Sequence, residues 1–277
     1  FFDYTATPEI YTLALHDALP ICSPSAWSAG SRPSPKMATP SNSAEAGAVT
    51  TPPSRGPSPG GKVSSVGPVP IVYFSDVLCI WAYIAQLRID AVEKAFGEKV
   101  RFDYRFCSVF GDTARKIPAA WGEVGGFDAF NAHLRQSAAQ FPEVALNPDI
   151  WLAVRPASSW SAHLFLKATQ LAEATGACAP GAAALLLRSL RRTFFCDGRD
   201  IARRDVQRAA ASEVGVDISR VEMLIGDGQA YAALASDHQD AEAMRIQGSP
   251  SFVFNDGRQK LYGNVGFRII SANIEEL

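Results

Sequence analysis

The sequence predicts an α/β fold in which a long all-helical insertion interrupts a small sheet. Residues 71–106 read as strand, helix and strand, which predicts a βαβ unit with parallel strands. From about residue 112 to residue 245, apolar residues recur at helical spacing. Near the C-terminus, Asp256-Gly257 separates two apolar-rich runs, and this dipeptide in that position indicates a β-hairpin.

The first three elements are defined by their hydrophobic periodicity. Residues 71–74 are Ile-Val-Tyr-Phe, an apolar run typical of a strand buried on both faces. From Ile80 onward the apolar residues recur at helical spacing, and Gly97 predicts the end of that helix. Apolar and charged residues then alternate over residues 100–106, which predicts the second strand.

The remaining elements complete one domain over residues 71–277. The helical insertion is expected at about 112–228, and a further helix follows it. Strands are expected at 252–254 and 259–262, and a last helix begins at about Phe267. With the insertion removed, this is the element order of the thioredoxin fold.

Residues 1–70 differ in composition from the rest and are predicted to be a disordered, low-complexity leader. They contain twelve of the 18 prolines, and such a segment buries too little surface to offset its chain entropy. Residues 1–21 resemble the peptide obtained when sequencing-adapter DNA is translated, so Met37 or a later position is the expected natural start. The alternative is an ordinary amphipathic leader.

Composition and charge exclude several classes of protein. The 26 basic and 28 acidic residues nearly balance, so neither nucleic acid nor a membrane is an expected partner. No run of eighteen apolar residues occurs. Five cysteines without a CxxC pair favour a reduced, cytoplasmic setting over a disulfide-stapled scaffold. Because CxxC, HxxxH and HExxH spacings are absent, no metal site is expected.

Cys79 is the residue with the clearest chemical potential. It lies where the first strand ends and the first helix begins. Free backbone N–H groups at a helix N-terminus favour thiolate over thiol, which makes the sulfur nucleophilic near neutral pH. The alternative is a small buried core cysteine.

Four blocks of sequence resemble the DsbA-like branch of the thioredoxin superfamily. They are SDVLCIWAYI at 75–84, SAHLFLKA at 161–168, FFCDGRDIARRDV at 194–206 and GSPSFVF at 248–254. The resemblance is strongest to FrnE-type oxidoreductases, and weaker to kappa-class glutathione transferases and 2-hydroxychromene-2-carboxylate isomerases. It implies a catalytic Cys79, flanked by Ser249 and a cis Pro250 that hold the substrate.

One departure from the family pattern affects the expected mechanism. Oxidoreductases of this family carry CxxC, whereas Ala82 stands at the second position here. Cys79 can therefore form a mixed disulfide with a substrate, but no second thiol of the motif can resolve it. An external thiol such as glutathione is the expected co-substrate, and no bound cofactor is expected. The substrate would be a thiol or disulfide, either peptide or glutathione. A glutathione-dependent transferase or isomerase and a non-catalytic binding module stay open as alternatives.

Three further residues are substrate-binding candidates with structural alternatives. Trp81 is expected on the lip of the site, or else packed against the insertion. His163 lines the substrate cleft or is a hydrogen-bonded core histidine. Asn264 corresponds to the region that contacts glutathione in the related transferases, or it caps the last helix. A homodimer is compatible with the sequence.

Overall fold

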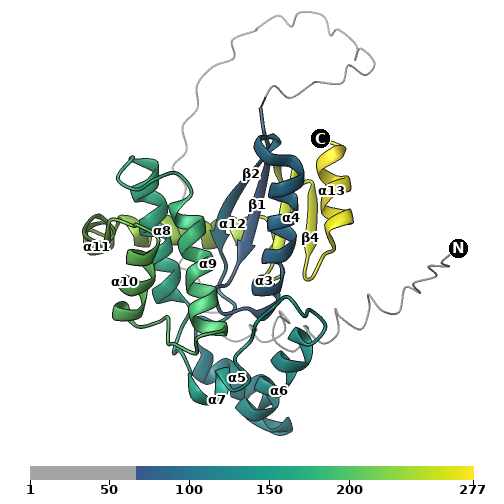
Figure 1. Cartoon of the computed structure of the whole chain (residues 1–277), viewed down its shortest axis with the longest axis vertical. Helices are drawn as coiled ribbons and strands as arrows, with labels where there is room; N and C mark the ends of the chain where they lie inside the picture. The colour runs from purple at the N-terminus through teal and green to yellow at the C-terminus, as the bar shows by residue number, and fades with distance from the viewer. Residues whose placement is uncertain (1–66) are drawn as a thin grey trace, which may run out of the picture.

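The structure, a computed structural model, describes residues 67–277 (Figure 1). The predictions of a disordered leader and of an adapter-like segment fall on residues 1–66 and lie outside the described residues. The sheet has four strands in the order β2-β1-β3-β4. The strands are β1 (Val69–Ser75), β2 (Val100–Phe106), β3 (Ser251–Phe254) and β4 (Gln259–Tyr262).

The strand pairing confirms the predicted βαβ unit and hairpin. β1 and β2 are parallel, with Val69 opposite Val100 and Ser75 opposite Phe106. β3 is antiparallel to both β1 and β4. β1 begins at Val69, two residues before the predicted Ile71, because the last residues of the expected leader also pair with β2.

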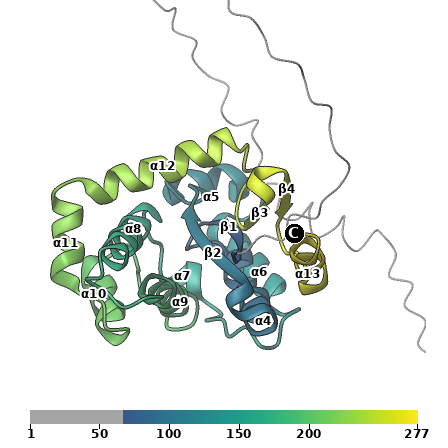
Figure 2. The ribbon, with the colours of Figure 1, turned by 90° about the horizontal axis from the view of Figure 1, so that it is seen from above.

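Helices enclose the sheet on both faces. α3 and α4 follow β1, and Gly97 ends α4 with a φ of 54°, a conformation that glycine adopts readily. α4 and α13 lie on one face of the sheet, and α12 runs along the opposite face (Figure 2). These four helices span Ile80–Ile84 (α3), Gln86–Phe96 (α4), Gln229–Ala243 (α12) and Phe267–Glu275 (α13).

The predicted insertion between β2 and α12 is entirely helical in the structure. α5, α6 and α7 lie at the end of the molecule where β1 leads into α3, and α8 to α11 form a bundle beside β2 (Figure 1). Their bounds are Thr113–Trp121 (α5), Gly126–Ala138 (α6), Ile150–Ala153 (α7), Trp160–Ala174 (α8), Ala182–Phe195 (α9), Arg204–Glu213 (α10) and Ile218–Gly226 (α11).

The central strand β1 is buried on both faces, as its apolar run predicts. Ile71 and Tyr73 belong to a cluster with Ile89 of α4 and Ile270 of α13. Phe74 points to the other face and belongs to the larger cluster that includes the insertion. The core of the molecule therefore continues from the sheet into the helical insertion.

Candidate active site

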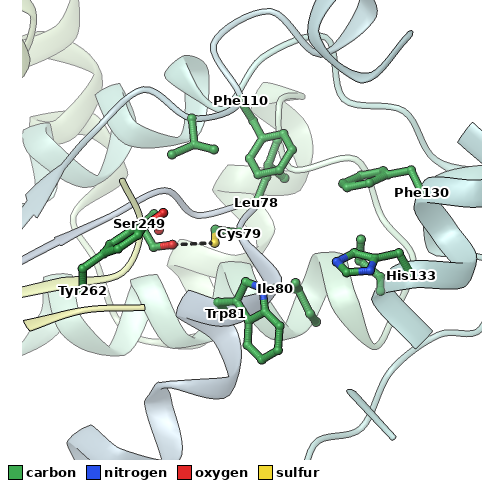
Figure 3. A pocket seen from close by; sticks show the side chains of 11 residues that line it. Leu78, Cys79, Ile80, Trp81, Phe110, Phe130, His133, Ser249 and Tyr262 are labelled. Atoms are coloured by element: carbon green, nitrogen blue, oxygen red, sulfur yellow. Dashed lines mark hydrogen bonds between the residues drawn. The ribbon is translucent and has the colours of Figure 1, made fainter. Parts of the chain in front are cut away.

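Cys79 lies at the junction between β1 and α3. It is the N-cap residue of α3, with an extended backbone (φ −82°, ψ 119°), and is 6% exposed. Its thiol donates a hydrogen bond to the backbone carbonyl of Ser249 over 3.3 Å, drawn as the dashed line in Figure 3. The sulfur is thus held between the helix N-terminus and the loop that enters β3.

The loop before β3 is fixed around this sulfur. The Ser249–Pro250 peptide bond is cis, as the resemblance implies. The Ser249 hydroxyl accepts a hydrogen bond from the Asp76 N–H over 2.8 Å, and the Pro250 carbonyl accepts one from the Gly263 N–H over 2.9 Å. Ser249 therefore contacts both ends of the turn that carries Cys79.

Asp76 anchors the cysteine turn, a role that the sequence analysis missed. Its Oδ1 accepts a hydrogen bond from the Leu78 N–H over 2.9 Å. Its Oδ2 accepts bonds from the N–H groups of Val109 (2.9 Å) and Phe110 (2.8 Å) and from the Ser159 hydroxyl (2.8 Å). The side chain is fully buried, so this carboxylate connects the turn after β1 to the loop after β2 and to the start of α8. The position of Asp76, three residues before Cys79 in the sequence, could have identified it as a residue of the site.

His163 is fully buried in α8 and supports the same turn. Its Nε2 accepts a hydrogen bond from the Val77 N–H over 3.0 Å, and its ring stacks on Phe106 with centroids 4.8 Å apart. Burial lowers the pKa of His163 to about 4, against the opposing effect of the Asp76 carboxylate. A neutral imidazole with an accepting Nε2 fits the core histidine that the sequence left as an alternative, and His163 does not line the cavity described next.

A largely apolar cavity surrounds the sulfur (Figure 3). It is formed by α3, the loop after β2, α6 of the insertion, the loop before β3, and β4. None of the described residues that line it is Lys, Arg, Asp or Glu. The lining residues are Leu78, Cys79, Ile80, Trp81, Val109, Phe110, Phe130, His133, Leu134, Ser249 and Tyr262.

The cavity contains some predicted site residues and several that were not predicted. Trp81 lines it beside Cys79 and also packs, partly buried, against the apolar cluster that includes the insertion. His133 and Phe130 of α6 and Tyr262 of β4 also line it (Figure 3). Their positions lie about fifty or more residues from Cys79 in sequence, and no motif spacing connects them to it.

Asn264 lies in the segment between β4 and α13 and is not among the residues that line the cavity. The expectation that it caps the last helix is wrong, because Gly266 is the N-cap residue of α13. The Asn264 Oδ1 is buried and has no hydrogen-bond partner among the described residues. Unlike Cys79, Trp81 and Ser249, Asn264 is therefore not part of the cavity lining.

Two other structural features bear on the expected chemistry. Within residues 67–277, no group of three His, Cys, Asp or Glu residues lies close enough to hold a metal ion. In the same part of the chain, every helix is too short or too polar to cross a membrane.

Comparison with known proteins supports the fold. The chain is 26% identical over 223 residues to the ClpXP adapter protein SpxH of Halalkalibacterium halodurans, covering 76% of this chain and 68% of that protein. Among solved structures, a probable DsbA oxidoreductase from Streptomyces coelicolor matches with a TM-score of 0.58 and 21% identity, covering 75% of this chain and 89% of that one.

Two further solved structures share the fold. The cytosolic disulfide reductase DsbM of Pseudomonas aeruginosa matches with a TM-score of 0.53 and 21% identity (70% of this chain, 89% of that one), and its structure with GSH scores 0.50. A 2-hydroxychromene-2-carboxylate isomerase matches with a TM-score of 0.52 and 17% identity (75% and 95%). The model of the DSBA-like thioredoxin domain matches residues 70–275. The chain belongs to the DSBA-like thioredoxin domain family.

Proposed function

We propose that this protein is a cytoplasmic thiol–disulfide oxidoreductase in which Cys79 is the single nucleophile and an external thiol completes the cycle. The observation that carries the proposal is the placement of the Cys79 sulfur. It lies at the start of α3, against the Ser249 carbonyl and beside Pro250, and it faces an apolar cavity. Family membership supports the oxidoreductase class.

The proposed chemistry is three successive thiol–disulfide exchanges. The Cys79 thiolate attacks one sulfur of a substrate disulfide, a Cys79–substrate disulfide forms, and the other substrate sulfur leaves as a thiolate that takes up a proton. Because position 82 is alanine, a second thiol must attack the mixed disulfide. With glutathione, this attack returns Cys79 as a thiol and leaves the substrate sulfur bonded to glutathione. A second glutathione then frees the substrate as a thiol and yields glutathione disulfide.

The lining of the cavity supports a preference for certain side chains next to the substrate disulfide. Its lining is mainly apolar, and Trp81 and Phe110 flank the sulfur (Figure 3). Such a surface favours a disulfide flanked by apolar peptide side chains. Glutathione as the co-substrate is supported by the missing thiol at position 82, and DsbM, which shares the fold, has been solved with GSH.

The direct test is the pH dependence of Cys79 alkylation, read by peptide mass spectrometry so that the other cysteines do not contribute. We expect fast labelling of Cys79 at pH 6 and a glutathione mixed disulfide on the same peptide after treatment with glutathione disulfide. Cys79→Ser should abolish both signals. Labelling that rises only near the ordinary thiol pKa of about 8.5 would contradict the nucleophile.

Two other functions have specific observations in their favour. The fold shared with 2-hydroxychromene-2-carboxylate isomerase favours glutathione-dependent isomerase or transferase chemistry. That alternative predicts a glutathione-dependent activity without a mixed disulfide at Cys79. The similarity to ClpXP adapter proteins favours a binding module instead, and this alternative predicts that a protein partner binds Cys79→Ser as tightly as the unaltered chain.

A further inference from the structure

Arg191 of α9 is a buried cation with neutral hydrogen-bond partners. Its side chain is fully buried. One guanidinium N–H donates to the Ser75 hydroxyl over 2.9 Å, and another donates to the Gln86 side-chain oxygen over 3.2 Å. Its Nε is buried without a partner, and none of the salt bridges among the described residues includes it. Burying a charge without a paired opposite charge is costly. A buried arginine without an acidic partner therefore suggests a functional role.

The two partners of Arg191 lie on either side of the cysteine turn. Ser75 is the last residue of β1, and Gln86 is the first residue of α4. Cys79 and α3 lie between them in the chain. Arg191 thus binds β1 before the cysteine turn and α4 after α3.

Tyr73 connects Arg191 with Cys79 in space. The guanidinium carbon of Arg191 lies 6.0 Å from the centre of the Tyr73 ring, and the Tyr73 hydroxyl donates to the Ala82 carbonyl of α3 over 3.5 Å. Burial raises the pKa of Tyr73 to about 12, while Arg191 lowers it and the charge of Cys79 raises it. The Tyr73 side chain thus extends from the Arg191 guanidinium to the backbone of α3, in buried surroundings where charges interact strongly.

We propose that the buried guanidinium of Arg191 is the counter-charge of the Cys79 thiolate and sets the pH range in which Cys79 reacts. The inference rests on the proposed function, because it requires Cys79 to work as a thiolate. Arg191 makes no hydrogen bond to the sulfur, so it is a positioning residue. Its positive charge acts on the Cys79 sulfur through the electrostatic field at the start of α3.

Other ionisable groups face the same region. His133 of α6 lines the same cavity as Cys79, and because it is unchanged in Arg191→Met, a shift caused by that substitution is not its effect. His163 is neutral near pH 7, since its pKa is lowered to about 4, and Tyr73 stays protonated. Cys107, which follows β2, is itself an acid. Arg105, whose guanidinium lies 6.0 Å from the Phe74 ring, is paired with two aspartates, Asp103 and Asp240.

Asp76 is the opposing charge in this region. Its carboxylate oxygens accept four hydrogen bonds near the cysteine turn. In Arg191→Met the Asp76 carboxylate stays in place while the cation is lost, and a nearby negative charge disfavours thiolate. The loss of Arg191 should therefore raise the pKa of the Cys79 thiol.

The test compares Arg191→Met with Arg192→Met, which removes the same charge from an exposed position next along α9. The full chain is alkylated across pH 5 to 9, and the Cys79 peptide is followed by mass spectrometry. We expect Arg191→Met to raise the labelling midpoint by about one unit, which corresponds to roughly tenfold slower labelling below the midpoint. Arg192→Met should leave the profile unchanged, and circular dichroism checks the fold of both variants.

A second measurement uses the unaltered chain and so does not depend on whether Arg191→Met folds. The ¹⁵N resonance of the Arg191 Nε–H should titrate with the Cys79 midpoint and stay flat in Cys79→Ser. A low midpoint that Arg191→Met leaves in place, or a flat Arg191 resonance in the unaltered chain, would overturn the inference while the proposed function stands. A midpoint near 8.5 in the unaltered chain would instead overturn the proposed function.

Discussion

The turn that carries Cys79 is held by buried polar side chains, each of which satisfies backbone groups of the turn. Asp76 accepts from the Leu78 N–H, and His163 accepts from the Val77 N–H. Ser249 accepts from the Asp76 N–H. Buried N–H groups that lose their partners cost about 1–3 kcal/mol each, so these contacts keep the sulfur in one position before any substrate binds.

Acid should destabilise the protein through His163. In the unfolded chain a histidine takes up a proton below about pH 6.5, whereas in the native state the pKa of His163 is lowered to about 4. The unfolded state therefore binds more protons between these values. The contribution of neutral His163 to stability is complete above pH 6.5 and is lost as the pH falls toward 4. The loss should approach about 1.4 kcal/mol per pH unit in that window.

The measurement is the free energy of urea unfolding between pH 7 and pH 4.5. His163→Gln is the control, because a Gln side-chain oxygen can accept from the Val77 N–H and does not titrate. Below pH 6.5, the free energy of unfolding should fall less steeply with decreasing pH in His163→Gln, because one fewer proton is taken up on unfolding. Equal slopes in the two proteins would show that His163 is not the acid-sensitive group.

Among the elements, the loop between β2 and α5 determines the shape of the cavity. It contributes Val109 and Phe110 to the lining, and the Trp160 indole donates to the Ser108 hydroxyl over 2.7 Å. Gly111 lies against this contact: a Cβ there would be 2.4 Å from the Ser108 oxygen and 2.9 Å from the Trp160 indole nitrogen. A Cβ at Gly111 would therefore displace the Ser108 hydroxyl or the Trp160 ring and disturb their hydrogen bond.

Gly111→Ala should be destabilising by about 0.5–1.5 kcal/mol, because the added methyl group displaces the Ser108–Trp160 hydrogen bond between the loop and α8. Gly226→Ala is the matched control, since a Cβ at Gly226, the last residue of α11, meets no atom within 4 Å. That variant should change stability by no more than about 0.5 kcal/mol. Urea unfolding of both variants is the measurement, and equal effects would contradict the packing argument.

The whole molecule is organised by one apolar cluster that joins the sheet to the insertion. Phe74 and Val253 of the sheet belong to the same cluster as Phe165 and Leu186 of the insertion. Asp237 of α12 adds polar contacts, since it accepts from the β2 backbone and from Lys167 of α8. The insertion and the sheet therefore depend on each other for burial.

We expect the sheet and the insertion to unfold as one cooperative unit. In native-state hydrogen exchange, the slowest amides of β1 and of α8 and α9 should open with free energies that agree within about 1 kcal/mol. Leu186→Ala should lower both values together, by about 2–5 kcal/mol. Insertion amides that open at several kcal/mol less than those of β1 would mean that the insertion unfolds separately.

Local signals in the sequence were enough to predict the elements and the position of Cys79. The apolar run at 71–74, the alternation over 100–106 and the Asp256-Gly257 turn each depend on neighbouring residues, and all three predicted elements are present. The same local reasoning placed Cys79 at the junction of β1 and α3. Ser249 and Pro250 were predicted from the family resemblance, and their loop lies against the sulfur.

The residues that surround this sulfur come from distant parts of the chain. Cys79 and Ser249 are 170 positions apart, and His133 comes from a helix in the middle of the insertion. Periodicity records which face of an element is buried, but it does not record which distant element covers that face. For this reason local patterns predict the strands, the helices and the place of Cys79 between β1 and α3, whereas the contacts of Asp76, His163 and Arg191 form only when chain folding brings distant residues together.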